Sequence, residues 1–526
     1  MGAAAHHNAP GLGWIVQKFG GTSVGKFPDK VSLARTAFWK WRRVASLSKN
    51  RVVVVCSARS TGKKTEGTTS RLLGVYDKLR AVNTAGATDD DRKLLVEAAN
   101  SLILDICNDH IFAAESYVRD PDLCATLVAR IKAECQELIE YIAAAKRFHL
   151  EINARSKDRV VSFGEKLSCL FMTALLRAHN VEAEYVDLCD VFHNDSAAQL
   201  GHAFYTKATA AFAAKIAACG ARVPVVTGFF GNVPGSLMEG DIGRGYTDLC
   251  AALCAVGLKS EELQIWKEVD GIFTADPSKV PTASLLSSIT PSEAAELTFY
   301  GSEVIHHLTM DQVIHADPPI PIRIKNVNNP RGNGTVVVPR PTPPPPRRRG
   351  GGSNNHYHQR SLSGSTSPSQ RPKRPTAVTI KDHISIINIH SNKRSISHGF
   401  FARVFSILDQ HSISVDLIST SEVHVSLAIH SGNLQLGGIA AAQAELEECG
   451  EVSIYTDMAI LSLVGADMRQ MVGIAGRMFS VLGEHQINLE MISQGASEIN
   501  ISCVIDAADA TRAMNVLHTH LFTFLD

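Results

Sequence analysis

The stretch W-I-V-Q-K-F-G-G-T-S-V-G-K, residues 14–26, is the part of this sequence that is most informative about its fold. A short β-branched run leads through Lys18 into the paired glycines Gly20 and Gly21. Glycines at the end of a strand let the backbone approach a ligand and turn its N–H groups inward, and a neighbouring lysine adds a point charge suited to phosphate. We therefore expect a phosphate-binding turn between a strand and a helix over residues 28–41. An ordinary strand-to-helix turn with a surface lysine is the alternative.

Up to about residue 338, the chain alternates short apolar strands with longer helical segments. The runs R-V-V-V-V-C-S (51–57), V-P-V-V-T-G-F-F-G (223–231) and E-L-Q-I-W-K-E-V-D (262–270) have the composition of strands buried in a parallel sheet. Residues 88–149 are rich in Ala, Leu, Ile and Glu and are expected to be helical. This alternation predicts an α/β sandwich with a mostly parallel sheet. Neither G-x-x-x-x-G-K-[ST] nor G-x-G-x-x-G after a strand occurs, so the turn at Lys18 belongs to another phosphate-binding architecture.

Composition excludes several classes of protein. The 526 residues, with 45% hydrophobic and 20% charged side chains, are typical of a globular protein with more than one domain. The 52 basic and 52 acidic residues cancel, which argues against a nucleic-acid partner. The 11 scattered cysteines predict reduced thiols. The sequence has neither a membrane-length apolar run nor a signal peptide, so we expect a cytoplasmic protein with no membrane partner.

A linker and an internal duplication organise the rest of the chain. Residues 339–376 contain no Asp or Glu and almost no aliphatic residue, so we expect a disordered linker there, and a disordered start over residues 1–13. The segment G-F-F-A-R-V-F-S-I-L-D-Q-H-S-I-S-V-D-L-I-S, from Gly399, matches G-I-A-G-R-M-F-S-V-L-G-E-H-Q-I-N-L-E-M-I-S, from Gly473. With the strands around them, the two copies have the order of ferredoxin-like βαββαβ modules. We predict an α/β domain over 14–338 and two such modules over 377–452 and 453–526.

Four further clusters carry candidate binding residues in the first domain. S-F-G-E (162–165) is expected to end a strand and begin a helix, where Glu165 would attract a substrate ammonium; a helix-start Glu favoured by the dipole is the alternative. G-D-I-G-R-G-Y-T-D-L (240–249) has the glycines of an anion-binding loop, with Arg244 able to bind a carboxylate bidentately. W-K-E-V-D-G-I-F-T-A-D-P (266–277) suits a nucleotide edge with Mg²⁺ and phosphate nearby. E-G-T-T-S-R-L (66–72) is expected to be a hydroxyl-rich loop.

In this order, the motifs resemble those of aspartokinases, the enzymes that phosphorylate the β-carboxylate of L-aspartate with ATP. The resemblance covers nearly the whole chain outside residues 1–13 and the linker. It rests on K-F-G-G-T-S-V, S-F-G-E, G-R-G-Y-T-D, V-D-G-I-F-T-A-D-P and G-S-E-V-I-H, and on S-H-G-F-F-A-R-V-F, V-D-L-I-S-T-S-E-V and S-Q-G-A-S-E-I-N-I-S in the tail. It implies an amino acid kinase fold followed by paired ACT modules. The motifs look closest to the fungal branch, which serves threonine, methionine and isoleucine synthesis and is usually inhibited by threonine.

The resemblance also implies roles for particular residues. The catalytic residues would be Lys18 and Asp248. The ATP-binding set, with Mg²⁺ accompanying the nucleotide, would be Lys18, Gly20, Gly21, Lys267, Glu268, Phe273, Asp276 and Lys279. The aspartate-binding set would be Thr69, Glu165, Arg244, Gly245, Tyr246 and Thr247. The effector-binding set would be Ser397, Gly399, Phe400, Phe401, Val415, Asp416 and Ser421, although Phe400, Phe401 and Val415 also fit a plain hydrophobic core.

Two positions depart from the family pattern, and two other readings stay open. Ser278 stands where the family usually has an arginine directed at the nucleotide, so Lys279 would replace it; His307 stands where proline is common. The sequence predicts an ATP- and Mg²⁺-dependent aspartate kinase with threonine feedback, forming a homo-oligomer through its ACT modules. No histidine spacing indicates a metal site held by the protein alone. A kinase for glutamate or acetylglutamate and a non-catalytic amino-acid sensor are the alternatives.

Overall fold

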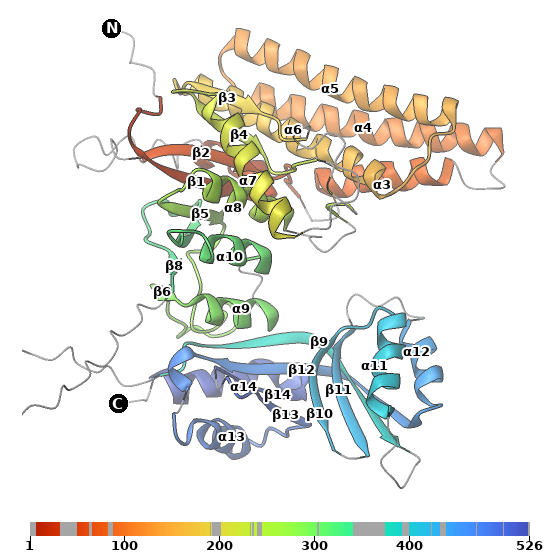
Figure 1. The fold of residues 1–526 in the computed structure, drawn as a ribbon, viewed down its shortest axis with the longest axis vertical. Coiled ribbons are helices and arrows are strands. Elements are labelled where there is room, and N and C mark those ends of the chain that lie inside the picture. The colour runs from red at the N-terminus through yellow and green to blue at the C-terminus, as the bar shows by residue number, and fades with distance from the viewer. Residues whose placement is uncertain are drawn as a thin grey trace, which may run out of the picture. The chain divides into compact units, whose positions relative to one another are not determined.

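The computed structural model describes residues 7–31, 50–62, 66–82, 88–189, 191, 201–231, 233, 236–238, 245–301, 305–339, 374–391, 399–421, 423–431, 438–469, 471–497 and 499–523 (Figure 1). The chain forms two compact units. The first comprises Met1–Ile272, Leu285–Pro291 and Val304–Val338, and the second comprises Phe273–Ser284, Ser292–Glu303 and Pro339–Asp526. Two short segments before the linker, 273–284 and 292–303, therefore belong with the tail.

An eight-stranded sheet forms the centre of the first unit. Its order is β3-β4-β2-β1-β5-β7-β8-β6, and every neighbouring pair is parallel except β7 with β8. The strands are β1 (Gly13–Phe19), β2 (Asn50–Cys56), β3 (Ala183–Val186), β4 (Val223–Thr227), β5 (Glu262–Lys267), β6 (Ser288–Ile289), β7 (Ile322–Asn326) and β8 (Thr335–Val337). The predicted α/β architecture with a mostly parallel sheet is confirmed. The carboxyl ends of β1, β2, β4, β5 and β7 meet at one edge, where ligands bind in open α/β sheets.

Helices cover both faces of this sheet. Helix α6 contacts β2, β3 and β4, whereas α8 contacts β1, β2 and β5. Val52 and Val54 belong to the hydrophobic core beneath α3–α6, and Val53 and Val55, which point to the other face, are also buried. Burial on both faces explains why β2 is a continuous valine run. The helices of this unit are α1 (Gly21–Lys26), α3 (Thr68–Val82), α4 (Asp89–Tyr117), α5 (Pro121–Phe148), α6 (Ala154–Ala178), α7 (His202–Ala217), α8 (Tyr246–Gly257) and α10 (His307–Ile314).

Several expected element boundaries were wrong. S-F-G-E does not begin a helix but lies inside α6, which starts at Ala154 with Asn153 as its N-cap in a capping box. The expectation that residues 88–149 are helical is confirmed; they form two helices, α4 and α5, because Asp120 caps a new helix with Pro121 in its first turn. The expected loop 66–72 is largely the start of α3. A helix begins at Pro28, as predicted, but a first short helix, α1, already starts at Gly21; residues 32–49 lie outside the described part of the chain.

The second unit contains one six-stranded antiparallel sheet in the order β10-β11-β9-β12-β14-β13. Its strands are β9 (Ala377–Ser391), β10 (Val415–Thr420), β11 (His424–His430), β12 (Gly450–Val464), β13 (Met491–Gln494) and β14 (Asn500–Asp506). Its helices are α9 (Pro291–Phe299, all but its first residue), α11 (Phe400–Gln410), α12 (Gly438–Leu446), α13 (Ile474–Glu484) and α14 (Ala510–His518). One hydrophobic core lies under α11 and α12, and another lies under α13 and α14.

The duplication is visible in the structure. Gly399 and Gly473 precede α11 and α13 with φ values of 90° and 85°, a left-handed conformation that favours glycine. The two long strands β9 and β12 run through both halves of the sheet and pair with each other in each half. Residues 377–381 pair with 460–464 beside β14, whereas 384–391 pair with 450–458, next to β11. The sheet of the second ACT-like half thus includes a strand segment that precedes the first half in sequence.

Candidate active site

Lys18 and Asp248 form an ion pair at the carboxyl end of the sheet. Lys18 lies on β1 between Val55 of β2 and Ile265 of β5. Its Nζ is 2.7 Å from Oδ1 of Asp248, and each side chain is 12% exposed. Asp248 is in the first turn of α8. The fold therefore joins the two residues that the sequence singled out as catalytic, although 230 positions separate them.

The paired glycines after β1 have different surroundings. A Cβ atom added to Gly21 would lie 2.1 Å from the carbonyl oxygen of Ala58, so a side chain cannot fit there. The amide of Ser60 donates to the Gly21 carbonyl at 3.0 Å. An added Cβ on Gly20 would meet no atom of the described residues within 4 Å. Gly21 thus allows the loop after β2 to approach the end of β1, while Gly20 borders open space that a ligand can occupy.

Glu165 is a buried carboxylate with one unsatisfied oxygen. The residue is 1% exposed, and its Oε1 accepts hydrogen bonds from the Tyr246 hydroxyl at 2.7 Å and the Ala58 amide at 3.3 Å. Within the described part of the chain, Oε2 is buried and has no hydrogen-bond partner. Burial raises the pKa of Glu165 from 4.5 to about 7, against the opposing effect of the two hydrogen bonds. A ligand ammonium placed at Oε2 would satisfy this oxygen and favour its ionised form.

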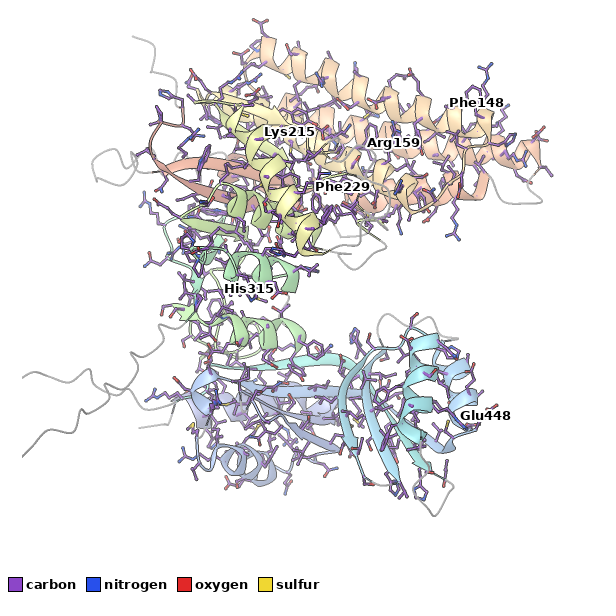
Figure 2. All side chains as sticks on the ribbon, in the orientation of Figure 1. Phe148, Arg159, Lys215, Phe229, His315 and Glu448 are labelled. Carbon is purple, nitrogen blue, oxygen red and sulfur yellow. The ribbon has the colours of Figure 1, made fainter. Side chains whose placement is uncertain are left out.

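The start of α8 connects Glu165 with Asp248. Gly245 precedes the helix with a φ of 107°, and a Cβ there would lie 2.6 Å from the His306 ring. Tyr246, whose hydroxyl reaches Glu165, also packs edge-on against Phe229 with ring centroids 5.5 Å apart. Phe229, labelled in Figure 2, follows β4 at the same edge of the sheet.

The remaining expected aspartate-binding residues are placed as follows. Thr247 is buried beside Asp248, and an added Cβ on Gly228 would lie 2.5 Å from its methyl group. Thr69 is half-buried at the second position of α3, next to Thr68, which approaches Gly164 of α6. Arg244 lies outside the described residues, so its carboxylate-binding role stays a prediction.

The expected nucleotide residues divide between the two units. Lys267 ends β5, and the following Glu268 accepts a hydrogen bond from Ser23 Oγ at 2.8 Å. Phe273, Asp276 and Lys279 belong to the second unit instead. There, Asp276 accepts hydrogen bonds from the Ser278 amide at 2.9 Å and from its hydroxyl at 2.7 Å, and Lys279 Nζ is 3.3 Å from Asp382 Oδ2.

Sequence reasoning missed several residues that shape this site. Asp158, two turns before Glu165 on α6, is 1% exposed and accepts hydrogen bonds from the Ser236 hydroxyl and the Leu237 amide at 2.9 and 2.6 Å. Its spacing of seven residues from Glu165, which places both carboxylates on one face of a helix, is the signal that could have identified it. Ser23 and Phe229 were within quoted motifs but carried no assigned role. No residue pattern indicated that the Ala58 amide would bind Glu165.

The described residues contain no group of three or more His, Cys, Asp or Glu side chains placed to hold a metal ion. All 11 cysteines are described and are free thiols. Among the helices that the structure describes, none is both long and apolar enough to cross a membrane.

The expected effector residues lie around α11 and β10. Phe400 is buried in the core under α11 and α12, and Val415 packs against that core, while Phe401 is 38% exposed. Asp416 Oδ1 is 2.7 Å from Lys381 Nζ, and its side chain is 6% exposed. The Ser421 hydroxyl accepts a hydrogen bond from the His424 amide at 3.3 Å in the turn that follows β10. Gly399 is exposed, and Ser397 lies outside the described residues.

Comparison with known proteins agrees with both halves of this fold. Residues 13–326 match the amino acid kinase family, and residues 461–521 match an ACT domain. The chain is therefore an amino acid kinase with an ACT-containing tail. It is 55% identical over 510 residues to "Aspartate kinase FUB3" of Gibberella fujikuroi, covering 97% of this chain and 98% of that protein. It is 48% identical over 516 residues to the aspartokinase of Saccharomyces cerevisiae, covering 97% and 93%.

The same relationship appears among solved structures. E. coli aspartokinase III in complex with lysine and aspartate superposes with a TM-score of 0.68 at 26% identity, covering 97% of this chain and 99% of that one. The form of that enzyme with aspartate and ADP gives a TM-score of 0.63 over the same shares of the two chains. This chain belongs to the aspartokinase family and is an ATP-dependent phosphotransferase of that family.

Proposed function

We propose that this protein transfers the γ-phosphoryl group of ATP to the β-carboxylate of L-aspartate, giving 4-phospho-L-aspartate. The buried Glu165 carboxylate is the observation that supports this most directly. Its unsatisfied oxygen suits the amine of an amino acid, and its other oxygen is linked through Tyr246 to the helix that carries Asp248 and hence to Lys18. An ammonium site and a phosphate-binding lysine thus belong to one connected set of contacts.

The chemistry of the reaction fits these side chains. The β-carboxylate of aspartate is already ionised at pH 7, so the reaction needs no strong general base. It requires two anions to approach each other and the charge on the transferred phosphoryl group to be stabilised. We assign the phosphate-facing charge to Lys18, the inward amides to Gly20 and Gly21, and the organisation of the transfer centre to Asp248.

Substrate binding divides among the remaining residues. Glu165 and Thr69 bind the amine of aspartate in this proposal, and Arg244 binds its α-carboxylate, with Gly245, Tyr246 and Thr247 shaping the loop. Lys267 and Glu268 border the nucleotide. The same role is proposed for Phe273, Asp276 and Lys279, of which Lys279 already has Asp382 as a partner within its own unit.

Mg²⁺ is proposed to enter with ATP. Magnesium in kinases is held by one or two carboxylates together with substrate phosphates, so a dedicated protein cage is not required. The carboxylates of Asp248 and Glu268 fit this arrangement, because both lie at the carboxyl edge of the sheet beside the Lys18 loop. The ion would neutralise part of the phosphate charge.

Regulation is proposed to act through the tail. The ACT modules would bind threonine near Gly399, Phe400, Phe401, Val415, Asp416 and Ser421, together with Ser397. The chain would form a homo-oligomer through these modules. Such feedback suits the first step of threonine, methionine and isoleucine synthesis in the cytoplasm.

The activity is tested by following aspartate-dependent ADP formation from Mg-ATP. We expect turnover with aspartate and none with glutamate or acetylglutamate. Turnover with glutamate instead would favour another amino acid kinase, and no turnover with any acceptor would favour a non-catalytic sensor. Threonine, lysine and methionine, added separately, identify the effector, and light scattering with and without threonine gives the oligomeric state.

A further inference from the structure

Arg59 is a buried cation that none of the expected contacts uses. It follows β2 in the sequence S-A-R-S and is 4% exposed. Its Nη1 donates to the carboxylate of Asp109 on α4 at 2.5 Å and to the Asp109 carbonyl at 3.3 Å. The neighbouring His110 is fully enclosed, and burial lowers its pKa to about 4, so it is neutral at physiological pH. Asp109 is therefore the group that balances the charge of Arg59.

The backbone around Arg59 holds the loop that carries Lys18 and the two glycines. The amide of Ser57 donates to the Phe19 carbonyl at 3.1 Å, and the amide of Ser60 donates to the Gly21 carbonyl at 3.0 Å. These two bonds fix residues 57–60 against the end of β1. A Cβ added to Gly21 would lie 2.1 Å from the Ala58 carbonyl oxygen, so the backbones of the two segments are in close contact.

The same four residues also hold the substrate side of the site. The Ala58 amide donates to Glu165 at 3.3 Å, and the Arg59 amide donates to Ser168 Oγ at 2.8 Å. The Arg59 carbonyl accepts a hydrogen bond from the Thr68 amide at 3.2 Å, at the start of α3. Residues 57–60 thus touch the Lys18 loop, the Glu165 helix and the Thr69 helix, and the Arg59 side chain is their attachment to α4.

We infer that Arg59 is a positioning residue for phosphoryl transfer: its buried ion pair with Asp109 fixes residues 57–60, which set the distance between the Lys18 loop and Glu165. This inference rests on the proposed function, because it assigns Arg59 to the geometry of that same site. Arg59 acts through the backbone of its own loop and contacts neither substrate. A displacement of about 1 Å between reacting groups is enough to reduce turnover by about 10²-fold.

The test compares Arg59→Met, Arg59→Lys, Asp109→Asn and the double variant Arg59→Met with Asp109→Asn, each measured for kcat, for KM of aspartate and ATP, and for Tm. We expect Arg59→Met and Asp109→Asn each to have a lower Tm than the wild type and a kcat that is 10- to 100-fold lower. Arg59→Lys should retain more kcat than Arg59→Met. The double variant leaves no unpaired buried charge, so its Tm should recover toward that of the wild type. Its kcat should stay low, because residues 57–60 are still not attached to α4.

Arg323→Met is the matched control. Arg323 pairs with Glu262 between β7 and β5 at 2.7 Å in the same unit, away from residues 57–60, so its loss should alter Tm without altering kcat. Recovery of kcat together with Tm in the double variant would overturn the inference, as would normal kcat in a folded Arg59→Met. An inactive wild-type protein would instead contradict the proposed function.

Discussion

Glu165 shows how far a single side chain can be interpreted before and after the fold is known. The sequence indicated a carboxylate suited to an ammonium, but not that it would be 1% exposed or that, among the described residues, one of its oxygens would have no hydrogen-bond partner. Burial at this position comes from α6 packing against the sheet, and such long-range packing leaves no local sequence signal. A carboxylate whose pKa is strongly raised by burial is typical of functional sites.

Replacing Glu165 with Gln should change the stability of the protein by an amount that depends on pH. The folded pKa of about 7 exceeds the ordinary 4.5, so between these values the unfolded chain loses a proton that the folded chain keeps. Stability therefore falls as pH rises from 4.5 to 7, by up to about 3 kcal/mol. Glu165→Gln removes this penalty, so its Tm relative to the wild type should increase from pH 5.5 to pH 8. A Tm difference independent of pH would contradict the assignment.

The same variant should weaken aspartate binding. Only the ionised carboxylate attracts the ammonium strongly, so the wild-type KM for aspartate should fall between pH 6 and pH 8. Glu165→Gln should raise that KM by about 10-fold or more and abolish its pH dependence, since it removes a charged hydrogen-bond partner. Steady-state kinetics at varied aspartate and saturating ATP measure both effects; an unchanged KM would exclude Glu165 from the aspartate site.

Replacing Lys18 with Ala should reduce turnover strongly. The Lys18 charge is proposed to act on the transferred phosphoryl group, so we expect kcat to fall by about 10²–10³-fold. Lys215→Ala, on α7 (Figure 2), is the control, because that lysine is exposed and donates a hydrogen bond to the Asp187 carbonyl. Single-turnover kinetics separate the chemical step from ATP binding. Retained turnover in a folded Lys18→Ala protein would refute the role.

At the scale of elements, the sequence predicted the existence of the strands and helices better than their limits. The apolar runs identified β2, β4 and β5, because burial on both faces leaves a continuous signal. The start of α6 at Ala154 was missed, because S-F-G-E was expected to begin the helix. Gly164 lies inside the helix, where an added Cβ would be 2.7 Å from the Cβ of Ala58. Its small size serves close packing, which sequence alone does not distinguish from a turn.

Gly164→Ala tests this explanation. The added methyl group must push α6 away from residues 57–60, so we expect a loss of about 1–3 kcal/mol in stability and reduced kcat, despite the higher helix propensity of alanine. Gly483→Ala on α13 is the control, since an added Cβ there meets no atom within 4 Å. Thermal unfolding and kcat measure the two effects. A Gly164→Ala protein as stable and active as the wild type would show that close packing is not the reason for this glycine.

At the scale of the whole molecule, the tail is not two modules in series. The duplication was evident from sequence, but the pairing of residues 377–381 with 460–464 was not, because strand partners leave no local pattern. A fragment of residues 374–523 should therefore fold cooperatively. A fragment of residues 374–452 should not, because it exposes Val378 and Ile380 without their partner strand. Circular dichroism during heating tests this, and a cooperative transition in the shorter fragment would contradict the shared-strand arrangement.

Feedback belongs to the same scale. Asp416→Ala should abolish inhibition by threonine while leaving basal kcat within about two-fold, because Asp416 lies in the second unit and pairs with Lys381 there. Asp457→Ala, at an exposed position of β12, is the control and should retain inhibition. Dose–response curves for threonine compare the three proteins. Unchanged inhibition in Asp416→Ala would remove this residue from the effector site.

The most direct test of the account is to trap the acyl phosphate with hydroxylamine and identify the product by mass spectrometry. The wild-type protein with Mg-ATP and L-aspartate should give β-aspartyl hydroxamate, whereas Lys18→Ala should give almost none. Glutamate and acetylglutamate should give no hydroxamate. Absence of an aspartate-dependent hydroxamate from folded wild-type protein, or its formation from glutamate instead, would contradict the assignment of this site to aspartate phosphorylation.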